Sequence, residues 1–511
     1  MSPPQPPNSF TCRSHVETSS PLSYESSQDC HPNDESPSSF NIQILGKSFQ
    51  NIEHLSLLQQ PLRQVSIGFG HVIILCENGK LLCFGRNDCG QCNRRVESLP
   101  PLSLNNSSIY GDTLDILQVT PLFDSLSSTE HQSEAMENTK QMLHHTMSVR
   151  SVHCGALHTM ILCENNLIFA CGSNSNGQLS IPSQVAQACG TEIEKFTRVD
   201  LSSCPLLLSS PLDSVTSSTM NRIKTLHCRF SHSGILSENG ELYCCGRNYD
   251  LELGIPKEEK IMKFTQVLNI PKMKLFDFAW KYMVAISVDN VIYASKYGIL
   301  KTVQDPNGNE FFCRYEKSEP NSFGDIIKLE CGNEHTMFLN SRHELYGFGY
   351  SVDGQIGVNS VVKQVVRIAL DRIKYDVIHD FTCAYNQSCI ITKKGYMYVS
   401  GLWDFTGLSA NDEEDPEAKQ VFLNYQNQKQ PVNVFQFTKL PVPKKRFNSI
   451  AMGNEISFLF HRYDNEYEYE KSLKAKLFRQ CQHCSNHQSL FDVVTIKCVN
   501  SLPSKNLNTL L

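Results

Sequence analysis

The stretch that decides the fold is Gly332-Asn-Glu-His335-Thr-Met-Phe-Leu339, which is followed by Phe348-Gly349-Tyr-Ser-Val-Asp-Gly354-Gln355-Ile-Gly357. A second copy reads Gly155-Ala-Leu-His158-Thr-Met-Ile-Leu162, followed by Cys171-Gly172-Ser-Asn-Ser-Asn-Gly177-Gln178. Units that recur in a fixed order, each too short to bury its own apolar face, predict a repeat fold.

Each unit has the pattern of a β-hairpin. In the first copy the apolar run Val72–Cys76 and the run Leu81–Gly85 are separated by Asn78-Gly79. Asn-Gly between two short apolar runs is a strong hairpin signal, and we expect a type I′ turn with positive φ at both central residues. The fifth copy departs from this rule, because Arg342-His343 occupies the turn. Each hairpin then ends on a glycine at which the chain leaves the sheet, namely Gly85, Gly172, Gly246, Gly349 and Gly401.

The first glycine of the unit, which we call the anchor, marks seven copies of the repeat. In chain order the anchor position holds Gly68, Gly155, Arg229, Ala279, Gly332, Ala384 and Gly453. The third residue after the anchor is His71, His158, His232 or His335 in four copies and Tyr282, Gln387 or Ile456 in the others. The anchors from Arg229 to Ala384 are 50, 53 and 52 residues apart. A period of about 50 residues, with one sheet of strand signal per period, predicts a β-propeller.

These motifs resemble the regulator of chromosome condensation repeat family, whose repeat combines a Gly-x-x-His strand, an apolar hairpin and an Asn-x-x-Gly-Gln-x-Gly loop. The loops that carry the resemblance are Asn87–Gln91, Asn174–Leu179 and Ser351–Gly357. The loop after Gly246 keeps only Leu253-Gly254, and after Gly401 the Gly-Gln pair has become Thr406-Gly407. The resemblance covers about residues 40 to 465 and implies a seven-bladed β-propeller. It is less specific for function, because propellers host many activities.

The seventh copy has the strand Ile450–Phe460 but lacks a following strand that ends on glycine. The segment Ile42-Gln-Ile-Leu-Gly46 near the start of the chain has the missing spacing. We therefore predict an all-β, seven-bladed propeller over residues 40–465, closed by an N-terminal strand. A disordered tail over residues 1–39 precedes it, and a short helix and strand tail over residues 466–511 follows it. The polar inserts at about 93–148 and 183–222 are expected to form loops on one rim.

The composition argues against nucleic-acid binding, secretion and membrane insertion. The net charge of −6 is spread without long runs, so nucleic acid is not an expected partner. The first 39 residues contain no apolar run, and no later run reaches 18 apolar residues, so we expect neither a secretory signal nor a membrane span. Cys154, Cys228, Cys331 and Cys383 precede anchors at a position that elsewhere holds Ile67, Phe278 or Met452. They are expected to be buried and unbridged, which favours the cytoplasm, with the nucleus as the alternative.

The repeated histidines are interpreted as structural, because equivalent residues of different blades cannot converge on one tetrahedral metal. We expect them to hydrogen-bond the backbone of the adjoining blade. The structural repeat positions are therefore Gly68, His71, Gly155, His158, His232, Gly332, His335, Gly85, Gly172, Gly246, Gly349 and Gly401. The anchor glycines Gly155 and Gly332 are expected where a Cβ has no room.

The C-terminal tail has a different character. Cys481-x-x-Cys484-x-x-His487 and the later Cys498 could ligate zinc, but their spacing matches no standard zinc knuckle. The run Ser489–Cys498 instead resembles the opening strand of a BTB domain, a module often placed after this kind of propeller.

The sequence shows no phosphate loop, no nucleophile elbow and no recurring pair of carboxylates, so no catalytic residues, metal or cofactor are assigned. The resemblance implies a monomeric protein-interaction scaffold with a protein partner. The alternative is a guanine-nucleotide exchange factor for a small GTPase, which needs no catalytic constellation because it only has to bind the nucleotide-free state more tightly. The chain's status as an enzyme thus stays open. A BTB-type adaptor for ubiquitination is a weaker alternative.

Overall fold

The structure is a computed structural model. It describes residues 42–45, 52–53, 61–93, 114–115, 117–119, 148–204, 222–256, 258–295, 300–304, 308–368, 370, 376–403, 419–421, 423–425, 431–440, 448–453 and 457–460. The chain divides into two units, Met1–Ser38 and Ser39–Leu511, and all described residues lie in the second unit. The predicted N-terminal tail and the C-terminal tail, with its zinc and BTB hypotheses, lie outside the described residues. No described helix is long and apolar enough to cross a membrane.

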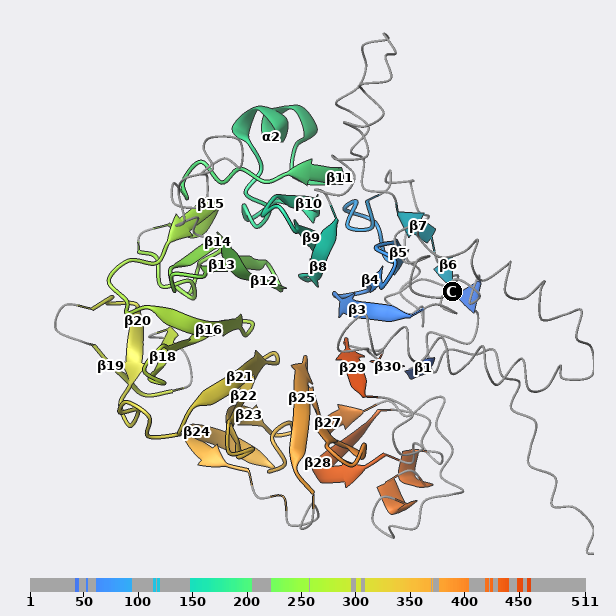
Figure 1. Cartoon of the computed structure of the whole chain (residues 1–511), viewed down its shortest axis with the longest axis vertical. Helices are drawn as coiled ribbons and strands as arrows, with labels where there is room; N and C mark the ends of the chain where they lie inside the picture. The colour runs from blue at the N-terminus through green and yellow to red at the C-terminus, as the bar shows by residue number, and fades with distance from the viewer. Residues whose placement is uncertain are drawn as a thin grey trace, which may run out of the picture. The chain divides into compact units, whose positions relative to one another are not determined.

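The second unit is an all-β propeller, in which consecutive antiparallel sheets (blades) succeed one another along the chain (Figure 1). Six sheets have four or five strands. From the inner strand outward, these are β3 Leu62–Ile67, β4 His71–Cys76, β5 Leu81–Gly85 and β7 Leu117–Val119; β8 Val149–Cys154, β9 His158–Cys163, β10 Ile168–Ser173 and β11 Glu192–Arg198; β12 Ile223–Arg229, β13 His232–Ser237, β14 Leu242–Arg247 and β15 Lys260–Gln266; β16 Met273–Phe278, β17 Met283–Ser287, β18 Ile292–Ser295, β20 Phe312–Tyr315 and β19 Thr302–Val303; β21 Ile326–Cys331, β22 His335–Asn340, β23 Leu345–Ser351 and β24 Ser360–Arg367; β25 Ile378–Ala384, β26 Gln387–Thr392, β27 Met397–Trp403 and β28 Val432–Lys439.

The predicted count of seven complete blades is wrong for the described residues, which form six. The last repeat contributes only β29 Ser449–Met452 and β30 Ser457–Phe460, and β1 Ile42–Leu45 pairs with β30 in a three-stranded sheet. The register places Ile42 opposite Phe460 and Leu45 opposite Ser457. The expected pairing between the N-terminal segment and the last repeat is therefore present. A short parallel pair, β2 Ile52–Glu53 with β6 Leu114–Asp115, lies apart from the blades.

The inner strands pack side by side: β3 on β8, β8 on β12, β12 on β16, β16 on β21, β21 on β25, β25 on β29 and β29 on β3. Second strands such as β4, β9, β22 and β26 are buried at every position, because both faces of these central strands are covered by neighbouring blades. The core therefore consists of apolar layers between adjacent sheets. Phe84 against Phe458, with ring centroids 5.8 Å apart, links the first blade to the three-stranded sheet.

The hairpin turns are tight, but they are not of type I′. Only the second turn residue has positive φ, as at Gly79 (80°), Asn166 (63°) and His343 (62°). The Gly79 N–H donates to the Cys76 carbonyl at 2.9 Å, and the Cys76 N–H donates to the Lys80 carbonyl at 2.9 Å. This pattern is a type I turn followed by one left-handed residue. The fifth copy keeps the same turn with His343, so its departure lies in the residue type and not in the backbone.

Both inserts contain regular structure that the sequence analysis treated as loop. In the second insert, α2 Ser183–Cys189 is followed by β11, the outer strand of its blade. Ile193 and Phe196 on β11 are buried and form the apolar side of this strand. The sequence analysis missed the strand because the residues between and around these two are polar. In the first insert, β7 pairs with β5. The reason is general, because the outer strand of a blade is half exposed and its pattern is mostly polar.

The four cysteines that precede anchors are buried, as predicted. Cys154, Cys228, Cys331 and Cys383 have free thiols. Burial raises the pKa of Cys154 to about 12, so this thiol stays protonated and packs as a small apolar group.

The anchor glycine and its histidine occupy one space. A Cβ on Gly155 would lie 2.0 Å from Cε1 of His158, and a Cβ on Gly332 would lie 2.0 Å from Cε1 of His335. The imidazole therefore fills the volume that any larger anchor residue would need. In the sixth blade Gln387 replaces the histidine, and the anchor there is Ala384, which carries a Cβ.

We expected the histidines to bond the backbone of the next blade. The backbone of His158 and of Gln387 does act on the pKa of His71 and His335, but the rings also bond side-chain hydroxyls of the next blade, which the sequence analysis did not predict. Nε2 of His71 lies 3.0 Å from Oγ1 of Thr159, and Nε2 of His158 lies 2.9 Å from Oγ of Ser233. Thr159 Oγ1 in turn donates to the Gln91 carbonyl at 2.8 Å. The hydroxyl hydrogen is used in that bond, so the hydroxyl accepts from an Nε2–H group, while burial lowers the pKa of the ring and keeps it neutral. In the fifth blade, His335 meets Ser388 at 2.9 Å in the same way.

Lowering the pH should weaken the fold through these rings. Burial lowers the pKa of His71 to about 4 and that of His158 to about 3. In the unfolded chain these two histidines bind protons as the pH falls through 6.5, whereas in the folded chain they stay neutral. The stability that the neutral rings contribute is therefore complete above pH 6.5 and is lost as the pH falls toward the pKa of the folded state. When the pH is lowered from 7 to 5, each ring should lower the free energy of unfolding by about 2 kcal/mol. Urea unfolding of the wild-type chain and of His158→Gln measures this, and the variant should show a shallower pH slope.

Candidate functional site: the axial pocket

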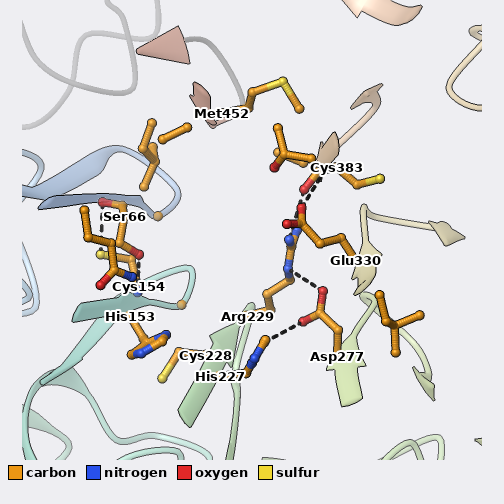
Figure 2. Close-up of a pocket in the computed structure, with 18 of the residues that line it drawn as sticks. Ser66, His153, Cys154, His227, Cys228, Arg229, Asp277, Glu330, Cys383 and Met452 are labelled. Atoms are coloured by element: carbon orange, nitrogen blue, oxygen red, sulfur yellow. Dashed lines mark hydrogen bonds and ion pairs between the residues drawn. The ribbon is translucent and has the colours of Figure 1, made fainter. Parts of the chain in front are cut away.

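The inner strands surround a pocket of about 430 Å³ on the propeller axis. Its lining comes from all seven repeats, from Gln64 and Ser66 on β3 to Ala451 and Met452 on β29. Figure 2 shows that the labelled side chains reach into this space from strands far apart in the sequence. The pocket is therefore a product of the whole ring of inner strands.

The residue two positions before the anchor faces the pocket in every repeat. These residues are Ser66, His153, His227, Asp277, Glu330, Thr382 and Ala451. Three of them accept a hydrogen bond from the next inner strand: the Cys154 N–H donates to Ser66 Oγ at 2.9 Å, the Cys331 N–H to Asp277 Oδ2 at 2.8 Å, and the Cys383 N–H to Glu330 Oε2 at 2.9 Å. One repeat position thus ties neighbouring blades together.

Arg229 crosses the pocket (Figure 2). Its Nε lies 3.5 Å from Oδ2 of Asp277 on β16, and its Nη2 donates to the Cys383 carbonyl on β25 at 3.0 Å. Asp277 is 2% exposed and also lies 3.4 Å from Nδ1 of His227. Burial alone would raise the pKa of Asp277, but the charges of Arg229 and His227 hold it below the usual value. Asp277 is therefore a charged carboxylate inside the ring.

A second charged group lies on β21. Lys328 Nζ is 2.9 Å from Oε1 of Glu330, pairs with Asp380 on β25 and donates to the Phe381 carbonyl. Despite its burial, these carboxylates raise the pKa of Lys328 above its usual value. The pair joins the fifth and sixth blades by side-chain contacts.

One end of the pocket is covered by aromatic residues that follow the anchors. The ring centroids of Phe69 and Tyr385 lie 6.0 Å apart, and those of Phe230 and Tyr385 lie 6.1 Å apart. Phe230 and Tyr385 both have positive φ, 48° and 42°. Backbone bonds between neighbouring blades run through the same level, such as Phe69 N–H to the Ala156 carbonyl at 3.1 Å. We call these three rings the aromatic floor.

The third repeat shows what sequence reasoning missed. The residue of the next blade that is equivalent to Thr159 and Ser233 is Met283, so His232 has no hydroxyl to bond there. Nε2 of His232 instead lies 3.2 Å from Oε1 of Glu252. Glu252 occupies the place of the loop glutamine, and Leu251 takes the place of the loop glycine with φ of 56°. The Leu253 N–H donates to Asn248 Oδ1 at 3.0 Å, as Leu179 N–H does to Asn174. The loop is therefore retained with other residues, and Arg229 at an anchor was the visible sign of a changed repeat.

The carboxylates of the pocket are engaged in contacts within the protein. They are held by cations and backbone N–H groups, and no cluster of three or more metal-ligating side chains occurs among the described residues. Of the predicted repeat residues, Gly68 and Gly155 line the pocket, and the others do not. The histidines in particular are spread over four blades.

The outer surface at the end of the aromatic floor carries exposed aromatic side chains on three successive blades. Tyr249, Trp280 and Tyr350 are 47%, 45% and 41% exposed. Arg247 Nη1 lies 3.5 Å from the Trp280 carbonyl, Lys281 Nζ lies 3.7 Å from Glu334 Oε1, and the Tyr350 N–H donates to the Glu334 carbonyl at 2.8 Å. These contacts connect the three blades into one surface. We call Tyr249, Trp280 and Tyr350 the aromatic face.

Three segments of the chain, residues 62–91, 149–178 and 326–355, match the family described as regulator of chromosome condensation (RCC1) repeat. Each segment runs from an inner strand to the Gly-Gln loop. The chain carries RCC1-type repeats. It is 22% identical over 260 residues to the ultraviolet-B receptor UVR8 of Arabidopsis thaliana, an alignment that covers 50% of this chain and 54% of the receptor. It is also 22% identical over 338 residues to the X-linked retinitis pigmentosa GTPase regulator of Canis lupus familiaris, covering 66% of this chain and 28% of that protein.

Solved structures agree on the fold. Human WBSCR16 superposes with a TM-score of 0.56 at 15% identity, covering 83% of this chain and all of that one. Prp20p of Saccharomyces cerevisiae superposes with a TM-score of 0.56 at 12% identity, covering 86% of this chain and 95% of that one. At these identities the likeness concerns the propeller alone. The chain spans about half of the plant receptor and less than a third of the GTPase regulator.

Removing the charge of Arg229 should strongly destabilise the ring. Arg229→Met leaves Asp277 buried beside His227 without its strongest cation, which we expect to cost about 3–5 kcal/mol. Adding Asp277→Asn should recover part of this loss. Urea unfolding at pH 7 measures both variants. The control is Arg367→Gln, which removes an exposed pair with Glu344 at 3.3 Å and should cost less than about 1 kcal/mol; equal losses for Arg229→Met and Arg367→Gln would refute the role of Arg229.

Proposed function

We propose that the chain is a protein-interaction scaffold that binds a partner on the aromatic face. The observation that carries this proposal is the exposure of Tyr249, Trp280 and Tyr350 on consecutive blades. Arg247 lies over the Tyr249 ring at 5.6 Å and Lys281 over the Trp280 ring at 4.6 Å. Trp, Tyr and Arg are the residues that most often dominate binding energy at protein interfaces. A rigid ring presents them with little loss of conformational entropy on binding.

Guanine-nucleotide exchange on a small GTPase is the second candidate. It is supported by the names of similar proteins: a GTPase regulator, and Prp20p, whose structure was described together with binding to Gsp1p and histones. The two functions differ in one measurable property. An exchange factor captures a GTPase stripped of nucleotide with EDTA and releases it when GTP is added, whereas a scaffold captures its partner irrespective of nucleotide.

We also propose that the three-stranded sheet is the seventh blade and that it closes the ring. β29 packs on both β25 and β3, which places this sheet between the sixth blade and the first. Its outer member, β1, comes from the opposite end of the sequence to β29 and β30. Such pairing of the two chain ends removes open sheet edges.

We further propose a reducing compartment, the cytoplasm or the nucleus, as the site of action. The described cysteines are free thiols, most of them buried at positions where they pack as apolar groups. Fluorescence microscopy of a tagged chain tests this, and secretion of the folded protein would contradict it.

Truncating the aromatic face should weaken partner capture without affecting folding. We expect Trp280→Ala combined with Tyr249→Ala to lower the affinity for a captured partner by about tenfold or more, because truncated interface aromatics cost at least 1.4 kcal/mol. Quantitative capture by the immobilised chain measures the effect. Phe435→Ala on β28, an aromatic residue of similar exposure (41%), is the matched control. If both variants capture the partner equally, the face is not the interface.

Deleting residues 40–50 should destabilise the whole propeller. The deletion removes β1 and leaves the edge of β30 unpaired, so unfolding should become less cooperative and its midpoint temperature should fall by several degrees. Calorimetry measures this change. Deletion of residues 1–38, which leaves β1 intact, is the control; if the two deletions behave alike, β1 does not close the ring.

A further inference from the structure

Six inner strands carry a β-bulge at their second residue. In the first blade Leu62 lies opposite Cys76 while Gln64 lies opposite Leu75, so Arg63 is an extra residue on the inner strand. The same offset recurs in the next five blades. The bulge residues are Arg63, Arg150, Lys224, Lys274, Ile327 and His379. A bulge leaves its extra residue unpaired in the ladder and redirects its side chain.

In four successive blades the bulge residue is basic. We call Arg63, Arg150, Lys224 and Lys274 the bulge arc. All four are half-buried and lie at the ends of the inner strands that face away from the aromatic floor. Arg63 lines a cavity of about 160 Å³ that shares Gln64 and Lys328 with the axial pocket. The arc thus lies at the end of the pocket opposite the aromatic face.

The middle cations of the arc are held in place by backbone carbonyl groups of the next blade. Arg150 Nη2 donates to the carbonyls of Ile223 and Lys224, both at 2.8 Å, and Lys224 Nζ donates to the Lys274 carbonyl at 3.0 Å. Each side chain therefore lies along the arc, from one inner strand toward the next. A guanidinium group has five N–H donors and an ammonium group three, so each cation keeps donors beyond these bonds.

The charge of the arc is not neutralised in its middle. Arg63 lies 3.8 Å from Glu164 and Lys274 lies 2.7 Å from Asp325. Within the described part of the chain, Arg150 and Lys224 have carbonyl acceptors but no carboxylate at ion-pair distance. Burial, and then the neighbouring His227 and Arg150, lower the pKa of His153 to about 3. This local excess of positive charge occurs in a chain whose net charge is −6.

We propose that the bulge arc binds an acidic peptide segment of a protein partner. The cations are distributed over four inner strands, so several carboxylates along one extended peptide can reach them, whereas a single phosphate group can reach only one or two. Clusters of basic side chains are a recurrent means of recognising acidic motifs. The inference extends the scaffold function to a second surface at the other end of the ring, and it rests on that function only in taking the ligand to be a protein segment.

Fluorescence anisotropy of a fluorescein-labelled hexaglutamate peptide with the full chain tests the proposal. We expect binding that weakens with added NaCl. Arg150→Gln combined with Lys224→Gln should weaken it by about tenfold or more, since it removes both unpaired cations. The control is Lys195→Gln combined with Arg198→Gln, an identical charge change on exposed positions of β11, which should leave the affinity unchanged.

The competing results are distinct. Equal affinities for the two double variants would overturn the proposal, and so would absence of binding by the wild-type chain. Inorganic tripolyphosphate that displaces the peptide at lower concentration than unlabelled hexaglutamate would overturn the assignment to a peptide. If Arg150→Gln/Lys224→Gln does not fold, Arg63→Gln replaces it, because within the described residues Arg63 pairs with Glu164 alone, at 3.8 Å; it should weaken binding severalfold. Trp280→Ala should not change peptide affinity, so failure of the arc and failure of the aromatic face can be told apart.

Discussion

The propeller depends on the contact between the imidazole of one blade and the hydroxyl of the next. In the Gly-x-x-His unit, the glycine leaves the space, the ring fills it, and Nε2–H reaches a Ser or Thr across the blade interface. The contact has strict requirements. The ring must be neutral, the neighbouring residue must carry a hydroxyl, and the anchor must lack a Cβ. Because the bond is buried, loss of one partner leaves an unsatisfied polar group, which is more costly than loss of an exposed bond.

The departures from this unit compensate one another. In the fourth blade Tyr282 replaces the histidine, and its Oη lies 3.1 Å from Thr336 Oγ1, so a longer side chain spans the same interface. In the third blade the facing residue is Met283, and His232 meets Glu252 instead. Burial would raise the pKa of Glu252, but His232 and Arg247 hold it below its usual value. The anchor of that blade is Arg229, which forms an ion pair with Asp277 across the pocket.

The repeat unit could be predicted from the sequence because it is local: the anchors, the hairpins and the glycines that end them follow one another within about 20 residues. The outer strands could not, because a half-exposed strand such as β11 has mostly polar residues and lies after a loop of variable length. The pocket could not be predicted either, since its charged residues Arg229, Asp277, Lys328 and Glu330 come from three different blades and each looks like an ordinary surface position in a half-polar strand. Asp277 and Glu330 differ from Ser66 only in residue type.

The two ends of the inner strands are under different constraints, and this difference explains where function can reside. At the anchor end, backbone bonds between blades, positive φ values and the aromatic floor fix the geometry. Trp280 follows its anchor as Phe69 does and makes the same kind of backbone bond to the next blade, so there the side chain can differ while the backbone cannot. At the bulge end, one residue per blade leaves the ladder and its identity does not affect strand pairing. Residues as unlike as Arg150, Ile327 and His379 occupy the same place. Strand pairing therefore does not require a cation at this position, and what the four successive cations add to the fold is the bonds of Arg150 and Lys224 to carbonyls of the next blade.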